Sequence, residues 1–272
     1  MRQRKPANIE GELVQYAAVI ESDPKALKGA WVQTFMPQAV ELRIDLGCGK
    51  GGWLVQAAKA NPQVFFVGLD NNPMCVARTA AKLQAEDVPN ARVVILDADC
   101  LADAFAPGEA NRLYLNFNSP FPPKKYAWKR LTYLDRLMGY RRLVGEDGLV
   151  DLRTDHDPYW QFTLTQLELA GYSIVRQTDD LHAHPEGFDV FESEYDQMTV
   201  ARGAVVHALQ AHPGPEPAFE PQQTAPLGLV SYLPEDLETL ERIPYGMEGT
   251  VENLRNKARN QRARLEAQGK RL

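Results

Sequence analysis

The 272-residue sequence predicts an α/β protein, in which a mostly parallel sheet carries helices on both faces. Between about residues 40 and 155, short runs of strand-forming residues alternate with helical patterns, as expected for parallel strands joined by crossover helices. Each run ends in glycine, aspartate, asparagine or threonine. Such residues are expected where an open α/β sheet binds ligands, at the carboxyl ends of its strands.

The individual elements follow from the spacing of apolar residues. One helix begins at Trp53, directly after a glycine-rich turn, and another begins at Asp157 and Pro158, an N-cap and a first-turn proline. Apolar residues recur at helical spacing in the second helix and are expected in the core: Trp160, Leu164 and Leu167. Seven strands are expected, at residues 40–46, 64–69, 92–96, 112–116, 149–153, 173–176 and, as the last edge strand, 199–208.

Proline content and charge divide the chain into three parts. Residues 1–211 are expected to form one domain with a basic N-terminal arm. Residues 212–233 are expected to be a linker, because five prolines stand between residues 213 and 226. Residues 234–272 are first acidic and then basic, and we expect a helical or disordered extension.

The composition indicates a cytoplasmic protein. The cysteines, Cys48, Cys75 and Cys100, form no C-x-x-C pair, which favours a reducing compartment and suggests neither disulfides nor a metal site. No apolar run approaches the roughly 20 residues that cross a bilayer. We expect a monomer or homodimer that does not associate with membranes.

The formal net charge of −6 hides two basic segments. Residues 124–142 hold seven lysines or arginines against one acid, and residues 251–272 hold seven against two. Two basic patches on an acidic chain suggest a surface for a polyanion such as nucleic acid. Solvated helix faces are the alternative that charge alone leaves open.

A glycine-rich turn follows the first long strand, at Asp45-Leu46-Gly47-Cys48-Gly49-Lys50-Gly51-Gly52. Glycines between a strand and a helix let a ligand approach the backbone where any Cβ would clash. The pattern Gly47-x-Gly49-x-x-Gly52 also satisfies the dinucleotide fingerprint, so glycines alone do not identify the ligand.

Three carboxylates narrow the choice of ligand. Asp45 precedes the first glycine, Asp70 ends the next strand, and Asp97 ends the third. Asp70 is placed to accept hydrogen bonds from ribose hydroxyls. An adenosyl ligand with a cationic sulfonium and no pyrophosphate suits three acids better than a dinucleotide. The alternative is that Asp70 and Asp97 only cap turns.

Over roughly residues 1 to 210, the chain resembles the bacterial tRNA (guanine-N7)-methyltransferases, which modify the guanosine at position 46 of the tRNA variable loop. The residues that carry the resemblance are Arg2, Arg4, Lys5 and Pro6; Lys28, Gly29 and Trp31; the loop 45–51; Asp97, Ala98 and Asp99; Pro107, Gly108 and Glu109; Tyr114 to Phe117; Lys129 to Thr132; Thr154 and Asp155; and Ser193 to Asp196. The resemblance implies a class I, Rossmann-like methyltransferase that uses S-adenosyl-L-methionine, releases S-adenosyl-L-homocysteine and binds tRNA.

The resemblance also assigns roles to residues. The cofactor is expected at Asp45, Gly47, Gly49, Gly51, Asp70, Asn71, Asp97, Ala98 and Asn116. The target nucleotide is expected to face Thr154, Asp155, Ser193, Tyr195 and Asp196. The basic segment after the fourth strand is expected to contact RNA through Lys124, Lys125, Tyr126, Lys129 and Arg130.

One motif departs from the family. Where the family reads Pro-Asp-Pro-Trp-Pro-Lys-Lys-Arg-His, residues 118–126 read Asn-Ser-Pro-Phe-Pro-Pro-Lys-Lys-Tyr. Ser119 replaces the aspartate to which a catalytic role is assigned, and we expect Asp155 or Glu194 to compensate in part, so Ser119, Asp155 and Glu194 are the candidate catalytic residues. The alternatives are an impaired or retargeted RNA-binding homologue, a small-molecule methyltransferase and, last, a nicotinamide dehydrogenase.

Overall fold

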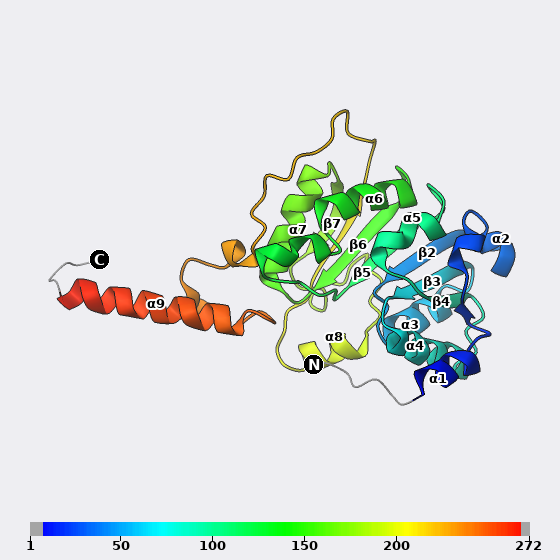
Figure 1. The fold of residues 1–272 in the computed structure, drawn as a ribbon, viewed down its shortest axis with the longest axis horizontal. Coiled ribbons are helices and arrows are strands. Elements are labelled where there is room, and N and C mark those ends of the chain that lie inside the picture. The colour runs from blue at the N-terminus through cyan, green and yellow to red at the C-terminus, as the bar shows by residue number, and fades with distance from the viewer. Residues whose placement is uncertain (1–7, 268–272) are drawn as a thin grey trace.

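A computed structural model describes residues 8–267, so the basic start at residues 1–7 and the last residues of the basic tail lie outside the described part. Its centre is an eight-stranded sheet of order β1-β4-β3-β2-β5-β6-β8-β7 (Figure 1). The strands are β1 (Ile20–Glu21), β2 (Glu41–Leu46), β3 (Val64–Asp70), β4 (Ala91–Ile95), β5 (Arg112–Asn116), β6 (Leu149–Thr154), β7 (Ser173–Thr178) and β8 (His207–His212). Strands β1 to β6 pair in parallel with one another, whereas β8 runs antiparallel to both of its neighbours, β6 and β7. The predicted α/β class is confirmed.

Helices cover both faces of the sheet (Figure 1). The described part of the chain contains α1 (Ile9–Gln15), α2 (Trp31–Phe35), α3 (Gly52–Ala60), α4 (Pro73–Ala85), α5 (Leu101–Ala104), α6 (Leu134–Val144), α7 (Asp157–Leu169), α8 (Glu194–Val200) and α9 (Glu248–Ala267). Neighbouring strand residues point to opposite faces, so β3 sends Phe66 into the apolar cluster with α3 and α4, and Phe65 into the larger cluster with α6 and α7. Burial on both faces explains why the central strands read as unbroken apolar runs.

Two details of the predicted sheet are wrong. The sheet has eight strands rather than seven, because the short β1 pairs with β4. Residues 199–208 do not form the last edge strand: Thr199 and Val200 close α8, and β8 begins only at His207. The β-branched residues there favour a strand, but Ser193 caps a helix that continues to Val200, and β8 then inserts between β6 and β7.

The segment after β8 returns to the domain. Arg141 donates hydrogen bonds to the carbonyls of Gly214 and Pro215, at 2.8 and 2.7 Å, so part of the proline-rich segment packs on α6. Leu229 and Val251 are fully buried in the larger apolar cluster. The division into domain, linker and extension stays a prediction, but these contacts hold residues 213–251 against the domain.

Helix α9 then projects away from the body (Figure 1). The helical alternative for the extension is therefore the one that the structure describes between residues 248 and 267. Within the described part of the chain, no helix combines the length and the apolar character needed to cross a bilayer.

Candidate active site

The glycine loop joins β2 to α3 in a conformation that only glycine adopts readily. Gly47, Gly49 and Gly51 have positive φ angles of 82°, 57° and 75°. A Cβ on Gly47 would lie 2.6 Å from the side-chain nitrogen of Asn118, and one on Gly51 would lie 2.5 Å from Thr79. The loop is thus tightly packed and exposes backbone at the end of the sheet.

A cavity of about 520 Å³ opens beside this loop, at the carboxyl ends of β2, β3, β4 and β5. It brings together seven of the residues predicted for the cofactor, the substrate or catalysis: Gly47, Asp70, Asn71, Asp97, Ala98, Ser119 and Lys129. Residues outside the predicted cofactor, substrate and catalytic sets complete its walls, above all Phe117, Asn118, Phe121, Trp128 and Arg136. A cavity of this size suits a drug-sized ligand.

Two carboxylates face the cavity in different electrostatic settings. Asp70 accepts hydrogen bonds from the amides of Gly49 at 3.1 Å and Asn72 at 2.8 Å, while burial raises its pKa. Asp97 accepts from the Asn71 side chain and the Asp99 amide, both at 3.0 Å, and the bond from Asn71 holds the pKa of Asp97 below its usual range. Because a carboxylate has about four lone-pair sites, both can accept further bonds from a ligand.

The third predicted carboxylate, Asp45, lies elsewhere. Its side chain is buried, is not among the residues that line the cavity, and accepts a hydrogen bond at 3.2 Å from Asn116, another predicted cofactor residue. Burial raises the pKa of Asp45 to about 7. Asp45 and Asn116 thus lie together at the strand ends beneath the loop, and direct contact of either residue with the cofactor stays a prediction.

The divergent motif forms the wall opposite Asp70. Its backbone is unusual, because Phe117 and Phe121 have positive φ angles of 50° and 43° although neither is glycine. The side chain of Asn118 donates to the carbonyl of Leu46 at 3.1 Å, which fixes the motif to the glycine loop. Ser119 stands between the two strained residues and is exposed on the cavity. Strained backbone of this kind clusters at functional sites.

Arg130 holds this motif in place. Its side chain is fully buried and donates to the carbonyls of Pro120, Phe121 and Pro122 at 2.8, 2.8 and 3.2 Å. A fourth bond reaches Leu227, beyond the domain, at 2.7 Å. Burial lowers the pKa of Arg130 to about 10. The expected RNA contact is therefore replaced by a positioning role, since no part of this guanidinium is open to a phosphate.

The other basic residues of the segment are exposed. Lys124, Lys125 and Lys129 lie on a short 3₁₀-helix, Lys124–Lys129, beside the cavity. The ammonium groups of Lys125 and Lys129 stand 4.9 and 5.4 Å from the ring centre of Tyr126. Trp128 is 54% exposed and lines the cavity. Aromatic rings between lysines form a surface suited to nucleotide bases and phosphates.

Residues predicted to face the target nucleotide form a second group, next to the cavity. The hydroxyl of Tyr195 lies 3.4 Å from the carboxylate of Asp155, and the Tyr195 ring packs at a tilt against Phe117, a cavity residue, with ring centres 5.3 Å apart. Thr154 is buried and accepts a hydrogen bond from the His156 amide at 3.2 Å. Tyr195 therefore links Asp155 to the cavity wall.

The remaining candidate site residues, Ser193, Glu194 and Asp196, lie at the start of helix α8, where each side chain makes a different contact. Ser193 caps this helix, accepting a bond from the Asp196 amide at 3.1 Å, and Asp196 is buried against His182 at 3.0 Å. Glu194 pairs with Lys82 and covers Gly52, at the glycine loop. Asp196 thus holds α8 instead of reaching a nucleotide, and Glu194 lies apart from Asp155.

Two contacts at this site come from the extension and were not predicted. Arg242 pairs with Asp155 at 3.1 Å, and the carbonyl of Tyr245 accepts from His156 Nε2 at 3.2 Å. The second ring nitrogen of His156 accepts from the Tyr159 amide at 3.1 Å, so both nitrogens of the neutral ring are used. Arg242 lies 87 residues after Asp155, and no local pattern indicates such a contact.

Known proteins resemble this chain in sequence. A family model described as "Putative methyltransferase" matches residues 39–209. A tRNA (guanine-N(7)-)-methyltransferase of Geobacillus thermodenitrificans is 31% identical over 211 residues, which are 78% of this chain and 97% of that protein. One from Lactiplantibacillus plantarum is 31% identical over 202 residues, 74% of this chain and 94% of the relative. The chain belongs to the tRNA (guanine-N(7)-)-methyltransferase family.

Solved structures agree on the fold. The 16S rRNA methyltransferase KamB matches with a TM-score of 0.53 at 14% identity, over 68% of this chain and 94% of KamB. An antibiotic-related methyltransferase matches with a TM-score of 0.52 at 18% identity, over 66% of this chain and 92% of that one. At such low identity these structures establish the class I methyltransferase fold alone.

The cofactor of the family is S-adenosylmethionine, and the site fits it. The loop that contains Gly47 lets a ligand approach the backbone, while Asp70 and Asp97 offer acceptors for hydroxyl and amine groups within one cavity. Negative charge there also suits a sulfonium cation. Among residues 8–267, no group of three or more His, Cys, Asp or Glu side chains could hold a metal ion.

Proposed function

We propose that this protein transfers a methyl group to N7 of guanine in tRNA, with the variable-loop guanosine at position 46 as the target. The observation that carries the proposal is the composition of one cavity, in which Asp70 and Asp97 face Asn118 and Ser119 of the motif that marks the family. The exposed lysines of residues 124–129 adjoin it. Family membership supports the choice of tRNA.

The residues of the cavity act mainly by positioning. Bound S-adenosylmethionine supplies an electrophilic methyl group on its sulfonium. Guanine N7 carries a lone pair at neutral pH, so no base has to remove a proton, and the rate depends on holding N7 in line at close range. We assign Asp70 to the ribose hydroxyls, Asp97 with Asn71 and Ala98 to the adenine, and Phe117, Ser119 and Phe121 to the side where the guanine enters.

Charge stabilisation by the protein is weak at this cavity. The purine gains positive charge as the methyl arrives, and a nearby carboxylate would stabilise it, whereas the Ser119 hydroxyl supplies only a dipole. Asp155 is neutralised by Arg242 and Glu194 by Lys82, and neither carboxylate lines the cavity. We infer that compensation for the missing aspartate is partial and that the enzyme relies on positioning.

RNA contact is assigned to the exposed aromatic and basic groups. Lys124, Lys125 and Lys129 would neutralise phosphates, while Tyr126 and Trp128 would stack on bases displaced from the tRNA tertiary structure. Binding should weaken steeply with salt, because each neutralised phosphate releases counterions. A cytoplasmic location and a monomeric or homodimeric state belong to the same proposal.

Mass spectrometry of tRNA nucleosides tests this function. Unmodified tRNA is incubated with the protein and S-adenosylmethionine, beside a tRNA that has adenosine at position 46. We expect N7-methylguanosine only in the first tRNA. Cofactor binding without transfer would indicate an impaired homologue, transfer elsewhere in the RNA a retargeted one, and transfer to a small molecule a different enzyme; each would overturn the proposal.

A further inference from the structure

Helix α9 has no role in the site described above. It lies beyond residue 209, where the match to the family model ends, and it extends away from the domain (Figure 1). Its residues 255–264 include five lysines or arginines and no acid, on a chain whose formal net charge is −6. Half of these ten residues are cationic although the whole chain is negative, so positive charge is concentrated on this helix.

The beginning of α9 is fixed to the active site. Met247 and Val251 are 1% and 0% exposed, and a Cβ on Gly246 would touch Pro122 of the divergent motif at 3.6 Å. The carbonyl of Tyr245, just before the helix, accepts from His156 at the end of β6. The helix therefore starts beside the place where the target nucleotide is expected and runs outward from it.

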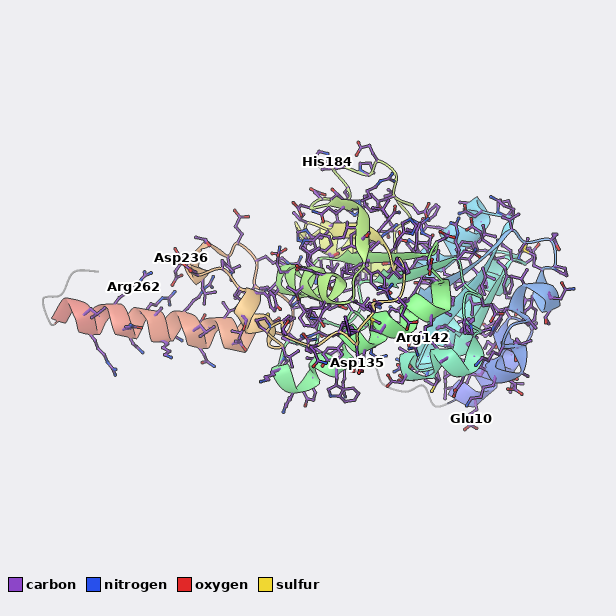
Figure 2. All side chains as sticks on the ribbon, turned by 90° about the horizontal axis from the view of Figure 1, so that it is seen from above. Glu10, Asp135, Arg142, His184, Asp236 and Arg262 are labelled. Atoms are coloured by element: carbon purple, nitrogen blue, oxygen red, sulfur yellow. The ribbon has the colours of Figure 1, made fainter. Side chains whose placement is uncertain are left out.

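The base of the helix is held by its own arginines. Arg255 donates to the carbonyl of Leu237 at 2.7 Å, and Arg259 pairs with Glu238 at 3.1 Å. The other cations of the helix, Lys257, Arg262 and Arg264, are exposed, and Figure 2 shows Arg262 on the projecting part, far from the body. Lys257 and Arg264 are seven residues apart, so they lie on one face of the helix.

An apolar partner does not fit this helix. Beyond the buried Val251, the only large apolar residues in its described side chains are the half-buried Leu254 and Leu265, so there is no continuous apolar stripe for another protein or a membrane. From Arg255 to Arg264 the helix consists of basic residues, amide residues and alanines. Charge complementarity therefore selects a polyanion.

We infer that α9 is a second contact surface for the phosphate backbone of the tRNA, in addition to the lysines beside the cavity. The inference rests on the proposed function for the identity of the RNA. A helix of 20 residues spans about 30 Å, long enough to follow a tRNA away from its variable loop. The contacts are assigned to phosphates, because exposed lysine and arginine side chains neutralise a nucleic-acid backbone whatever its sequence.

The test compares two double variants of the full chain. Lys257→Gln with Arg264→Gln removes two cations from α9 and keeps residues that favour helices. Lys25→Gln with Lys59→Gln removes two exposed cations that pair with Asp103 and Glu86, outside both residues 124–142 and α9. Affinity for unmodified tRNA is measured at several salt concentrations, and cofactor affinity by calorimetry.

We expect the α9 variant to bind tRNA roughly tenfold more weakly at low salt, with a salt slope reduced by about one to two, and to bind the cofactor normally. The control variant should bind tRNA as the unaltered protein does. Equal effects in both variants, or none in either, would overturn the inference. A chain that ends at Asn256 keeps Val251 and Arg255 but also loses Arg259 and Arg262, so it should bind tRNA at least as weakly as the α9 variant.

This test is independent of the methyl-transfer assay. If the unaltered protein methylates N7 but the α9 variant binds normally, only the inference fails. If the α9 variant loses RNA affinity while no N7-methylguanosine forms, the inference about the surface holds and the proposed reaction fails.

Discussion

The guanidinium of Arg242 lies 3.1 Å from the carboxylate of Asp155, so the extension contacts the first residue after β6. The Arg242 side chain is 41% exposed and that of Asp155 only 9%. The same carboxylate is within reach of the Tyr195 hydroxyl, and the Tyr195 ring packs at a tilt against Phe117 at the cavity. The extension is in this way connected to the wall that faces the target.

Replacing Arg242 should change the KM for tRNA more than the affinity for the cofactor. We expect Arg242→Ala to raise KM for tRNA about two- to fivefold, the range for a partly exposed ion pair, and to leave cofactor affinity unchanged. A double-mutant cycle with Asp155→Asn should give a coupling of about 0.5 to 1 kcal/mol. Lys59→Ala breaks an exposed pair of the same length, Lys59 with Glu86, and serves as the control. Strictly additive effects would argue against the coupling.

Removing the Asp70 carboxylate should weaken binding of the cofactor. Asp70→Ala loses the proposed acceptor for the ribose hydroxyls, and we expect cofactor affinity to fall about 10- to 100-fold, as for hydrogen bonds to a charged group. Isothermal titration calorimetry with S-adenosylhomocysteine measures this. Asp103→Ala, at an exposed carboxylate paired with Lys25, should bind normally. Unaltered affinity in Asp70→Ala would remove Asp70 from the cofactor site.

Restoring an acid at position 119 should accelerate the chemical step. Ser119→Asp places a carboxylate on the cavity wall where the purine becomes cationic, and we expect the single-turnover rate to rise roughly ten- to a hundredfold. Ser119→Asn, which adds similar bulk without charge, separates electrostatics from shape. A rate that rises equally in both variants would contradict the electrostatic explanation.

Stability should depend on pH through Asp45. Its folded pKa, about 7, lies above the value for an unfolded chain, so the folded state binds more protons and loses stability as pH rises through this window. Between pH 5 and pH 8, Asp45→Asn should gain about 2 to 3 kcal/mol relative to the unaltered protein. Urea unfolding of both proteins at the two pH values measures it. A pH-independent difference would show that Asp45 is not shifted.

The elements that read clearly in the sequence are those in which local pattern and tertiary structure agree. Buried strands such as β3 are apolar throughout, and their polar ends place Asp70 and Asp97 at one edge of the sheet, so the cavity was largely predictable. The strand predicted at residues 199–208 was wrong because β-branched residues occur both at helix ends and in strands.

A single sequence did not allow us to predict which charged side chains are buried. Arg130 and Lys129 are neighbours of like charge, yet one is fully buried and the other exposed on the cavity. The difference arises because the carbonyls of the motif converge on Arg130, a consequence of backbone conformation rather than composition. The contact of Arg242 with Asp155 likewise depends on how the extension folds back.

Arg130 couples local opening of the active-site motif to local opening of the extension. It binds carbonyls of the motif and of Leu227, and the Leu229 amide donates to Pro122 at 3.0 Å. Segments joined in this way open together as one cooperative unit. Slow hydrogen exchange at the Leu229 amide would therefore report that the motif is closed, and cleavage of the chain between residues 213 and 226 would loosen the wall at Ser119 without removing a single residue of it.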